Sequence, residues 1–246
     1  MGIQKILWQK PMLRVCYALT PLVFASIYLF GWRTLAVTLT VLFFGILTEA
    51  AFTYPQKKPV TSAVLVTGLI FTLSLPPTIP FWMAIVGIVV GVAIGKMMFG
   101  GFGQNVFNPA MVGRCFIYIT FPLHMTNRWI EPIWGGLGGF AHWSGPMDTV
   151  SGATPLEVLR QGGAIAWEDL ILGHTSGSMG ETSAILILAG GLFIIAKKAA
   201  SWRLVLSYIM GGIVASAVFR LAGSSIIPSP LETLLAGSFL FGSFFV

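Results

Sequence analysis

The sequence predicts an all-α polytopic membrane protein that forms one membrane domain over residues 1–246, and two observations lead to that prediction. Hydrophobic residues make up 56% of the chain and charged residues only 9%, and the mean hydropathy is +0.87, more apolar material than a water-soluble core requires. The apolar residues come in blocks of roughly 17 to 25, the length that a helix needs to cross about 30 Å of hydrocarbon, and not in alternating strands of about 10 residues. We therefore expect about eight transmembrane helices.

The first four spans are joined by short hairpins. The first follows Lys5 and Lys10 as a signal peptide would, but it is long and no small-residue cleavage site follows it, so we interpret it as a retained span. Near the end of the second span, Glu49 is an ionisable group that could help a cation to enter; alternatively it is a polar residue at a helix end that reaches the interface. The four spans are expected at 12–31, 34–54, 60–76 and 79–98.

The fifth span, 108–123, is short and follows a break in the helical pattern, FGGFGQNVFNPA at 99–110. A helix interrupted by glycine and proline leaves free backbone groups at membrane depth, which are tolerated only beside a cavity or a ligand. A simpler interpretation is that Asn108 caps a helix that begins at Pro109. The tripeptide NPA also resembles the aquaporin signature, but the chain lacks a second copy. Arg114, inside this span, could pair with a phosphate or with a carboxylate of another helix.

The last three spans are expected at 182–198, 203–222 and 231–246. The sixth begins after LGHTSGSMGE, residues 172–181, which is a second interruption of the helical pattern. Two interrupted helices in two halves of a chain are typical of the inverted repeats of transporters.

The interval 124–181 is a long, glycine-rich loop that contains six of the eight acidic residues of the chain. If the N-terminus is cytoplasmic, nine basic residues lie on the cytoplasmic side and four outside, which is the bias that the positive-inside rule predicts. We therefore place the loop on the extracytoplasmic face. The nine are Lys5, Lys10, Arg14, Lys57, Lys58, Lys96, Lys197, Lys198 and Arg203; the four are Arg33, Arg128, Arg160 and Arg220.

Within the loop, the stretch DTVSGATPL at 148–156 is polar and rich in small residues. Its threonine hydroxyl is flanked by small residues, so a modifying enzyme could grip the backbone and reach the oxygen. On local grounds alone the stretch is also a good helix start, in which Thr154 or Ser151 is the N-cap, Pro155 the first helical residue and Glu157 the partner in a capping box.

The pattern D-x-x-S-G-A-T-x-L resembles the signal at which a flavin transferase joins flavin mononucleotide (FMN) to threonine through a phosphoester. In a helical membrane protein it resembles the membrane subunit shared by the sodium-pumping NADH:quinone oxidoreductase and the Rnf electron-transport complex, the NqrB/RnfD family. GGFGQNVFNPAMVGRCF at 100–116 and LETLLAGSFLFGSFFV at 231–246 resemble the same family. The short stretch ahead of the first span favours the RnfD side, and the family has about ten spans where eight are expected here. The residues that match the flavinylation motif are Asp148, Ser151, Gly152, Ala153, Thr154 and Leu156.

The resemblance implies covalent FMN on Thr154 and a second, non-covalent flavin, riboflavin, near Asn105 and Asn108. It implies a redox-driven ion translocase of Rnf or Nqr type, coupled to Na⁺ or H⁺, with an inverted-repeat architecture similar to that of urea transporters. The implied location is the bacterial or archaeal cytoplasmic membrane, and the implied partners are the other subunits of the complex, a flavin transferase and the lipid bilayer. A urea-transporter-like channel without a redox role and a scaffold subunit remain the alternatives.

Other residue patterns predict little further chemistry. Cys16 and Cys115 are interpreted as small core residues, and His124, His142 and His174 have no metal-ligand spacing, so we expect no metal site. The net charge of +6 is attributed to basic residues at the span ends, and no nucleic-acid partner is expected.

Overall fold

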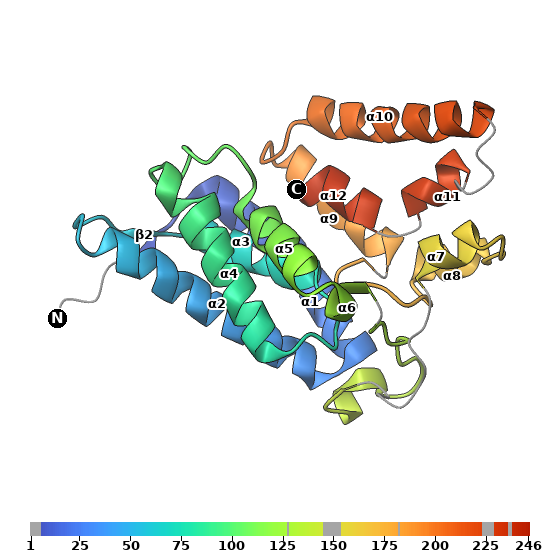
Figure 1. Cartoon of the computed structure of the whole chain (residues 1–246), viewed down its shortest axis with the longest axis horizontal. Helices are drawn as coiled ribbons and strands as arrows, with labels where there is room; N and C mark the ends of the chain where they lie inside the picture. Colours follow the sequence, from blue (N-terminus) through green and yellow to red (C-terminus); the bar gives the residue numbers. More distant parts are fainter. Residues whose placement is uncertain (1–5, 127, 145–153, 182, 223–228, 236–237) are drawn as a thin grey trace.

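The computed structural model describes residues 6–126, 128–144, 154–181, 183–222, 229–235 and 238–246, in which helices dominate (Figure 1). The first part of the chain forms α1 (Lys10–Phe30), α2 (Trp32–Thr53), α3 (Ala63–Leu73), α4 (Phe81–Gly95), the 3₁₀ helix η1 (Met97–Phe99) and α5 (Pro109–Thr120). Then follow α6 (Pro122–Thr126), the 3₁₀ helix η2 (Gly138–Ala141), α7 (Pro155–Arg160), α8 (Trp167–Leu172), α9 (Ala184–Ala196), α10 (Trp202–Leu221), α11 (Pro230–Leu235) and α12 (Ser238–Phe245).

Four helical segments are long and apolar enough to cross a membrane: Lys10–Phe30, Trp32–Thr53, Phe81–Phe99 and Trp202–Leu221. They coincide with the first, second, fourth and seventh predicted spans, so the polytopic helical class is confirmed. The chain is a multi-pass membrane protein.

The other four predicted spans are shorter in the structure than the sequence predicts. The spans expected at 60–76, 108–123 and 182–198 are α3, α5 and α9, with 11, 12 and 13 residues. At about 1.5 Å per residue such helices are roughly 17 to 20 Å long, less than the hydrocarbon thickness. The single span expected at 231–246 is instead two helices, α11 and α12. A hydropathy window does not show where helices end within an apolar run, so the count of about eight spans stays a prediction.

A two-residue parallel strand pair departs from the all-α expectation. Ile6 and Leu7 of β1 pair with Val60 and Thr61 of β2. The pair joins the segment before α1 to the segment before α3, and the N–H of Ser62 continues it by donating to the carbonyl of Leu7 at 3.0 Å. It fixes the backbone of Thr61, which holds a buried carboxylate described below.

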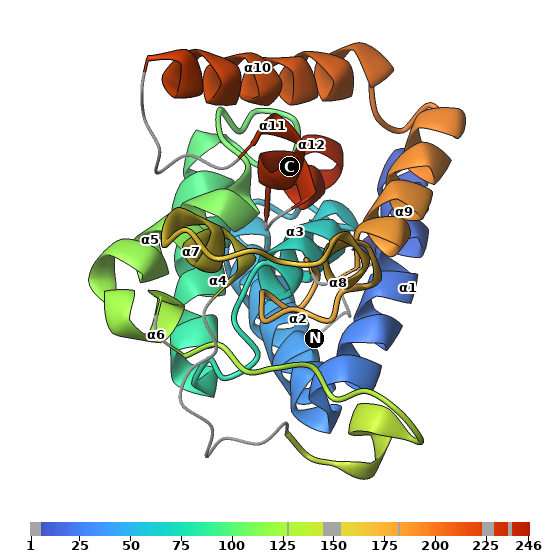
Figure 2. The ribbon, with the colours of Figure 1, turned by 90° about the vertical axis from the view of Figure 1, so that its right-hand side faces the viewer.

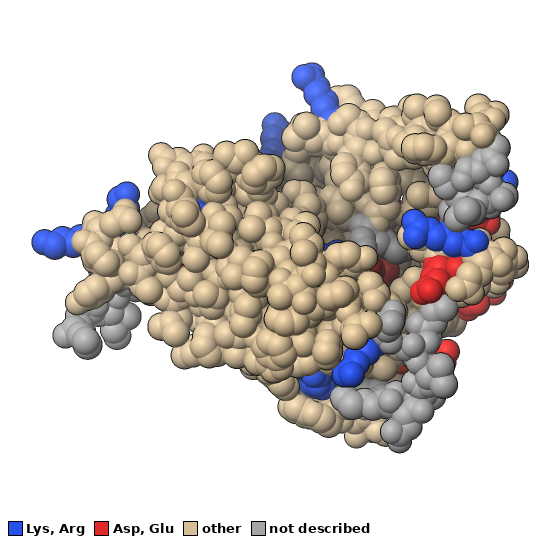
Figure 3. Space-filling view, in the orientation of Figure 1, with Lys and Arg blue, Asp and Glu red and all other residues tan. Residues whose placement is uncertain are grey.

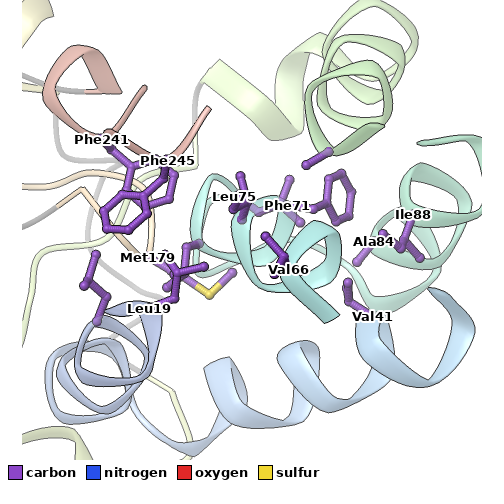
Figure 4. Packing of buried hydrophobic residues seen from close by; sticks show 14 of the residues in the cluster. Leu19, Val41, Val66, Phe71, Leu75, Ala84, Ile88, Met179, Phe241 and Phe245 are labelled. Carbon is purple, nitrogen blue, oxygen red and sulfur yellow. The ribbon is translucent and has the colours of Figure 1, made fainter. Parts of the chain in front are cut away.

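The hydrophobic core is centred on α3, whose residues are buried over most of their length. Figure 4 shows side chains from α1, α2, α4 and α12 around those of α3, and Met179 beside Leu75. The N–H groups of Met179 and Gly180 donate to the carbonyls of Leu75 and Leu73 at 3.0 and 2.8 Å. The segment that precedes α9 therefore docks directly on the C-terminal end of α3, so the second predicted interruption meets the end of a short helix.

Close packing of α4 on α5 depends on glycines spaced four residues apart, a pattern that lets two helix backbones approach. A Cβ atom added at Gly91 would lie 2.5 Å from the carbonyl oxygen of Pro109, and one at Gly113 would lie 2.4 Å from the carbonyl oxygen of Gly87. The break between the two helices is confirmed. Its Gly100 and Gly101 have φ of +108° and +100°, a left-handed region that favours glycine.

The described part of the interval 124–181 contains only short helices. Its segment 138–143 covers the turn between α1 and α2, where the N–H of Arg33 donates to the carbonyl of Trp143 at 2.7 Å. In Figure 2, α7 and α8 lie on the face turned to the viewer, with α10 along the top. Figure 3 shows the visible Asp and Glu side chains gathered at the end of the molecule that carries α7 and α8, as the sequence count predicts.

Candidate functional site

Thr154 occupies the N-cap position of α7, with Pro155 as the first helical residue, as predicted. Its carbonyl oxygen accepts hydrogen bonds from the N–H groups of Glu157 and Val158 at 2.9 and 3.0 Å. The predicted capping box is wrong, because the Thr154 side chain makes no cap hydrogen bond. A capping box is found instead at the start of α11, between Ser229 and Glu232. The hydroxyl of Thr154 is thus not used to start its helix.

A cavity of about 420 Å³, called the Thr154 cavity here, is lined in part by Thr154. Its wall combines a hydroxyl-rich side with aromatic rings, and the rings of Tyr208 and Phe239 lie 4.8 Å apart between centroids. A mixed lining with a few polar groups is typical of small-molecule sites. The described wall residues are Arg114, Trp129, Thr154, Pro155, Leu156, Leu170, Thr175, Ser176, Gly177, Glu181, Tyr208, Thr233, Leu235 and Phe239.

Of the described residues on this wall, only Arg114 carries a positive charge. Its Nη1 lies 3.5 Å from Oε1 of Glu181, so it pairs with a carboxylate, one of the two partners that the sequence predicted. The pair is loose. The side chain of Arg114 is 23% exposed, and Oε1 of Glu181 has no hydrogen-bond partner among the described residues. The guanidinium is therefore available to an anion in the cavity.

The structure places only part of the flavinylation motif. Thr154 and Leu156 lie on the cavity wall. Asp148, Ser151, Gly152 and Ala153 lie outside the described residues, so their predicted role stays a prediction.

A second cavity of about 530 Å³, called the Lys96 cavity here, contains both asparagines of the broken segment on its wall. Asn108 is the N-cap of α5, and its Oδ1 accepts from the N–H of Ala110 at 3.0 Å, which confirms the capping interpretation. Its Nδ2 donates to the carbonyl of Val246 at 3.3 Å, and Nδ2 of Asn105 donates to the carbonyl of Phe107 at 2.9 Å. The amide donors predicted to meet a ligand are thus already bonded within the chain.

Glu49 is buried and paired. Its side chain is 1% exposed, so the interpretation as a residue that reaches the interface is wrong. Oε2 lies 2.6 Å from Nζ of Lys96, which is 2% exposed, and Oε1 accepts from the N–H and the hydroxyl of Thr61 at 2.9 and 2.6 Å. Lys96 also donates to the Thr61 hydroxyl at 2.9 Å. Lys96, counted as a topology signal in the sequence, is a partner of this carboxylate.

The two cavities lie along the same two helices. Asn108, at the start of α5, is on the wall of the Lys96 cavity, and Arg114 in the same helix is on the wall of the Thr154 cavity. Six residues correspond to roughly 9 Å along a helix axis. Similarly, Phe239 of α12 lines the Thr154 cavity and Ser243 lines the Lys96 cavity. The broken helix predicted from the sequence therefore connects two sites.

Sequence reasoning missed Glu181, Tyr208, Phe239 and the role of Lys96, because tertiary packing brings them to the cavities. Lys96 alone carried a signal, since it is a charge inside an apolar run. The interpretation of Cys115 as a core residue is also wrong, because its side chain is exposed, whereas Cys16 is half-buried and packs on the core.

Comparison with known proteins gives matches over almost the whole chain. A family model described as "NQR2, RnfD, RnfE family" matches residues 4–246. The chain is 36% identical to a subunit of the Na⁺-translocating NADH-quinone reductase of Azotobacter vinelandii, over 80% of this chain and 49% of that protein. It is 36% identical to the corresponding subunit of the reductase of Pseudomonas paraeruginosa, over 86% of this chain and 52% of that protein.

A third relative is a subunit of the proton-translocating ferredoxin:NAD⁺ oxidoreductase complex of Clostridium ljungdahlii, which is 33% identical over 100% of this chain and 73% of that protein. All three relatives are named as subunits of ion-translocating redox enzymes. The chain spans about half the length of the two NADH-quinone reductase relatives that it matches. On the extent of these matches, the chain belongs to the NQR2, RnfD, RnfE family.

Proposed function

We propose that the chain is the membrane subunit of a redox-driven, ion-translocating electron-transport complex. In this proposal electrons pass through FMN joined to Thr154 by a phosphoester and through riboflavin in the Lys96 cavity, and their transfer is coupled to the movement of Na⁺ or H⁺. The relatives are named for one or the other of these ions. A bound flavin supplies one- and two-electron transfer, while the protein positions the ring and tunes its potential.

The observation that carries the proposal is the position of Thr154. Its side chain makes no capping hydrogen bond, and the residue lines a cavity whose wall also includes the cation Arg114 and the aromatic rings of Tyr208 and Phe239. A phosphoester to threonine keeps a negative charge, which suits the Arg114 guanidinium on the same wall. The rings of Tyr208 and Phe239 offer apolar faces to a flat ring system. The residues present therefore fit FMN at this site.

The Lys96 cavity suits a neutral flavin without a phosphate. Its described wall combines apolar side chains of α1, α3 and α12 with Thr67, Ser201 and Ser243. The side-chain amides of Asn105 and Asn108 donate to the backbone carbonyls of Phe107 and Val246, so a ring carbonyl would have to replace those acceptors in order to bind them. We therefore propose that riboflavin is held mainly by packing against the apolar wall residues, and less by hydrogen bonds from the two asparagine amides.

The proposed assembly places this chain among other subunits in the bacterial or archaeal cytoplasmic membrane. The names of the relatives as subunits of larger enzymes support such partners. A flavin transferase would be needed to modify Thr154, and the exposed apolar surface of α10 suits contact with lipid. We propose a cytoplasmic N-terminus and an extracytoplasmic 124–181.

The decisive experiment denatures the purified chain in SDS and measures flavin fluorescence at the 26.5 kDa band. We expect wild-type protein to fluoresce and Thr154→Ala to lose the signal entirely, because no other hydroxyl can replace the attachment atom. Thr175→Ala is the matched control: it removes another hydroxyl from the same wall and should keep the signal. The tryptic peptide that contains Thr154 should gain the mass of FMN less water.

Two outcomes would overturn this function. A colourless wild-type band together with solute flux in liposomes would favour the urea-transporter-like channel. A colourless band without flux would favour a scaffold role within a complex.

A further inference from the structure

The segment before α9, which is the second interruption predicted from the sequence, forms part of the wall of the Thr154 cavity. Its backbone is fixed, because the N–H groups of Met179 and Gly180 donate to carbonyls at the C-terminal end of α3 at 3.0 and 2.8 Å. A segment held in this way presents its side chains to a ligand at defined positions. Its wall residues with polar side chains are Thr175, Ser176 and Glu181.

Glu181 is the residue of this segment that lacks a hydrogen-bond donor. Its side chain is only 7% exposed, and its Oε1 accepts no hydrogen bond from any described residue. Nη1 of Arg114 lies 3.5 Å from that oxygen, which is longer than the usual N–H···O distance of about 2.7–3.2 Å. A buried carboxylate oxygen without a donor is unfavourable, and folded proteins almost always supply a partner for it. Because Glu181 lines the cavity, a ligand in the cavity can supply the donor.

Arg114 can hold this carboxylate and an anion at the same time. A guanidinium presents several N–H donors in a planar fork, and the ion pair with Glu181 is made through Nη1. Among the described residues of this wall, Glu181 is the one carboxylate and Arg114 the one cation. The pair therefore offers two different contacts to one ligand: the cation attracts a phosphate, and the carboxylate accepts a hydrogen bond from a donor beside that phosphate.

FMN carries its charge and its donors in an order that matches this pair. Its phosphate is joined to the ribityl chain, the ribityl hydroxyls come next, and the ring system is at the other end. The N–H of the oxidised ring lies on the side away from the ribityl chain. Since the facing atoms of Arg114 and Glu181 are 3.5 Å apart, a donor that meets Glu181 while the phosphate meets Arg114 is a ribityl hydroxyl and not the ring N–H.

We propose that Arg114 and Glu181, called the clamp here, together bind the phosphoribityl part of the flavin at Thr154. Arg114 binds the phosphate, and Glu181 accepts a hydrogen bond from a ribityl hydroxyl. The assignment rests on the proposed function, because it needs FMN at Thr154. The clamp also gives the site a selectivity that a cation alone lacks. The carboxylate repels an anion that brings no donor, such as a lipid phosphodiester without hydroxyl groups, and favours a phosphate with hydroxyls beside it.

The test follows the motion of the attached flavin in the assembled complex, purified in detergent. Time-resolved fluorescence anisotropy separates a flavin that turns only with the protein from one that moves about its attachment on the nanosecond scale. The same complex with Thr154→Ala lacks this flavin and gives the background of any other flavin. The mass of the peptide that contains Thr154 gives the flavin content of each variant, so that motion is compared per attached flavin.

Glu181→Met removes the acceptor and should raise the loosely held fraction of the flavin at least about tenfold, the factor equivalent to one hydrogen bond to a charged group. Glu181→Gln keeps an uncharged acceptor, should give a smaller rise, and replaces Glu181→Met if that variant does not fold. Glu157→Met is the matched control. This exposed carboxylate is only three positions from Thr154 but does not line the cavity, so its removal should leave the fraction unchanged.

A purely structural Glu181 predicts the opposite result. If Glu181 were only a partner of Arg114, its removal would free the guanidinium for the phosphate, and the flavin would be held as firmly as before or more firmly. An unchanged or smaller loose fraction in Glu181→Met therefore refutes the clamp and leaves the proposed function intact. A flavin that stays firmly held in Arg114→Met also refutes it, because the phosphate is then bound elsewhere.

Two outcomes concern the attachment itself. Loss of the flavin from the Glu181 variants, with a wild-type melting temperature and with Glu157→Met still modified, would support the clamp, because the site then cannot receive the flavin without the carboxylate. A wild-type complex without flavin at Thr154 would overturn the proposed function, and the clamp with it.

Discussion

Two buried cations organise this chain at the level of single residues. Lys96 neutralises a carboxylate, but Arg33 does not pair with an acid in the described structure. Arg33 is only 8% exposed, and its guanidinium donates instead to backbone carbonyls of the turn between α3 and α4. Nη1 donates to the carbonyl of Pro77, and Nη2 donates to the carbonyls of Ile79 at 2.6 Å and of Thr78 at 3.3 Å. Arginine suits this role because its planar fork presents several donors at fixed angles.

The first prediction concerns Arg33. Replacing it by methionine should lower the stability of the purified protein by about 1–3 kcal/mol, because the carbonyls of a turn rich in proline lose their donors. Arg33→Lys should recover only part of this, since one ammonium cannot reach three carbonyls. Arg128→Met is the matched control: the side chain is exposed beside the same turn, and the change should stay within about 0.5 kcal/mol. Equal melting temperatures for Arg33→Met and wild type would show that the carbonyls find other donors.

The residue scale was only partly predictable from the sequence. That Glu49 and Arg114 merit attention follows from their charge inside apolar runs, and the N-cap at Asn108 follows from the Asn-Pro pair. Their partners Lys96 and Glu181 are 47 and 67 positions away in the sequence. No local pattern links residues so far apart. The partners depend on which helices pack together, which one sequence does not show.

At the level of elements, glycines decide how closely helices approach. In α4 the spacing Gly87, Gly91, Gly95 places one edge of the helix free of side chains, and α5 packs against that edge through Pro109 and Gly113. The same contact holds the first residues of α5 in place, and they form part of the Lys96 cavity wall. The glycine edge therefore positions the broken segment as well as the helix pair. Four-residue spacing of small residues is visible in the sequence, but the helix that it meets is not.

The second prediction compares two glycines in helix interiors. Gly91→Ala should destabilise the protein by about 1–3 kcal/mol, because its Cβ would come within 2.5 Å of the Pro109 carbonyl oxygen and separate α4 from α5. Gly211→Ala in α10 has nothing within 4 Å of the added atom and should be neutral or slightly stabilising. Thermal unfolding in detergent measures both. The riboflavin proposed for the Lys96 cavity should also be retained less well by Gly91→Ala. A Gly91→Ala protein as stable as Gly211→Ala would mean that the helix contact is looser than the structure indicates.

The helix count illustrates a physical limit of hydropathy. The long helices were predicted within a few residues because each apolar block is continuous and ends at a polar or turn residue. The short helices α3 and α5 were predicted too long, since apolar residues such as Leu75 and Phe121 continue past their ends. The predicted bounds of α9 were two residues too wide at each end, where polar residues flank the helix. Leu75, which follows the end of α3, is fully buried and packs against Met179. Hydropathy therefore does not distinguish an apolar residue that faces lipid from one that is packed inside the protein.

At the scale of the whole molecule, the two cavities meet α5 at different levels: the Lys96 cavity at its first residue, Pro109, and the Thr154 cavity near its middle, at Arg114. The Lys96 cavity is formed near the turn between α9 and α10 and the start of α1, and the Thr154 cavity near α7 and α8. In the proposed orientation, which rests on the positive-inside count, these two regions face the cytoplasmic and extracytoplasmic sides. Arg33 and Lys96 entered that count although both are buried for internal reasons. Without them, eight basic residues remain on one side and three on the other, so the proposed orientation does not depend on them.

The orientation leads to the last prediction, which tests the whole arrangement in intact cells. In a chain whose Cys16 and Cys115 are replaced by alanine, Gln161→Cys and Gln56→Cys introduce single exposed thiols. Gln161 follows α7 directly, and Gln56 lies in the turn after α2, beside Lys57 and Lys58. A membrane-impermeant maleimide should label Gln161→Cys at once, because the loop 124–181 carries few basic residues and is proposed to be extracytoplasmic. It should label Gln56→Cys only after the membrane is permeabilised, since translocating paired lysines is unfavourable. The reverse pattern would put Thr154 on the cytoplasmic side, away from any extracytoplasmic flavin transferase, and would remove the topological basis for covalent FMN. Labelling of both thiols in intact cells would indicate leaky membranes, which a cytoplasmic marker protein detects in the same samples.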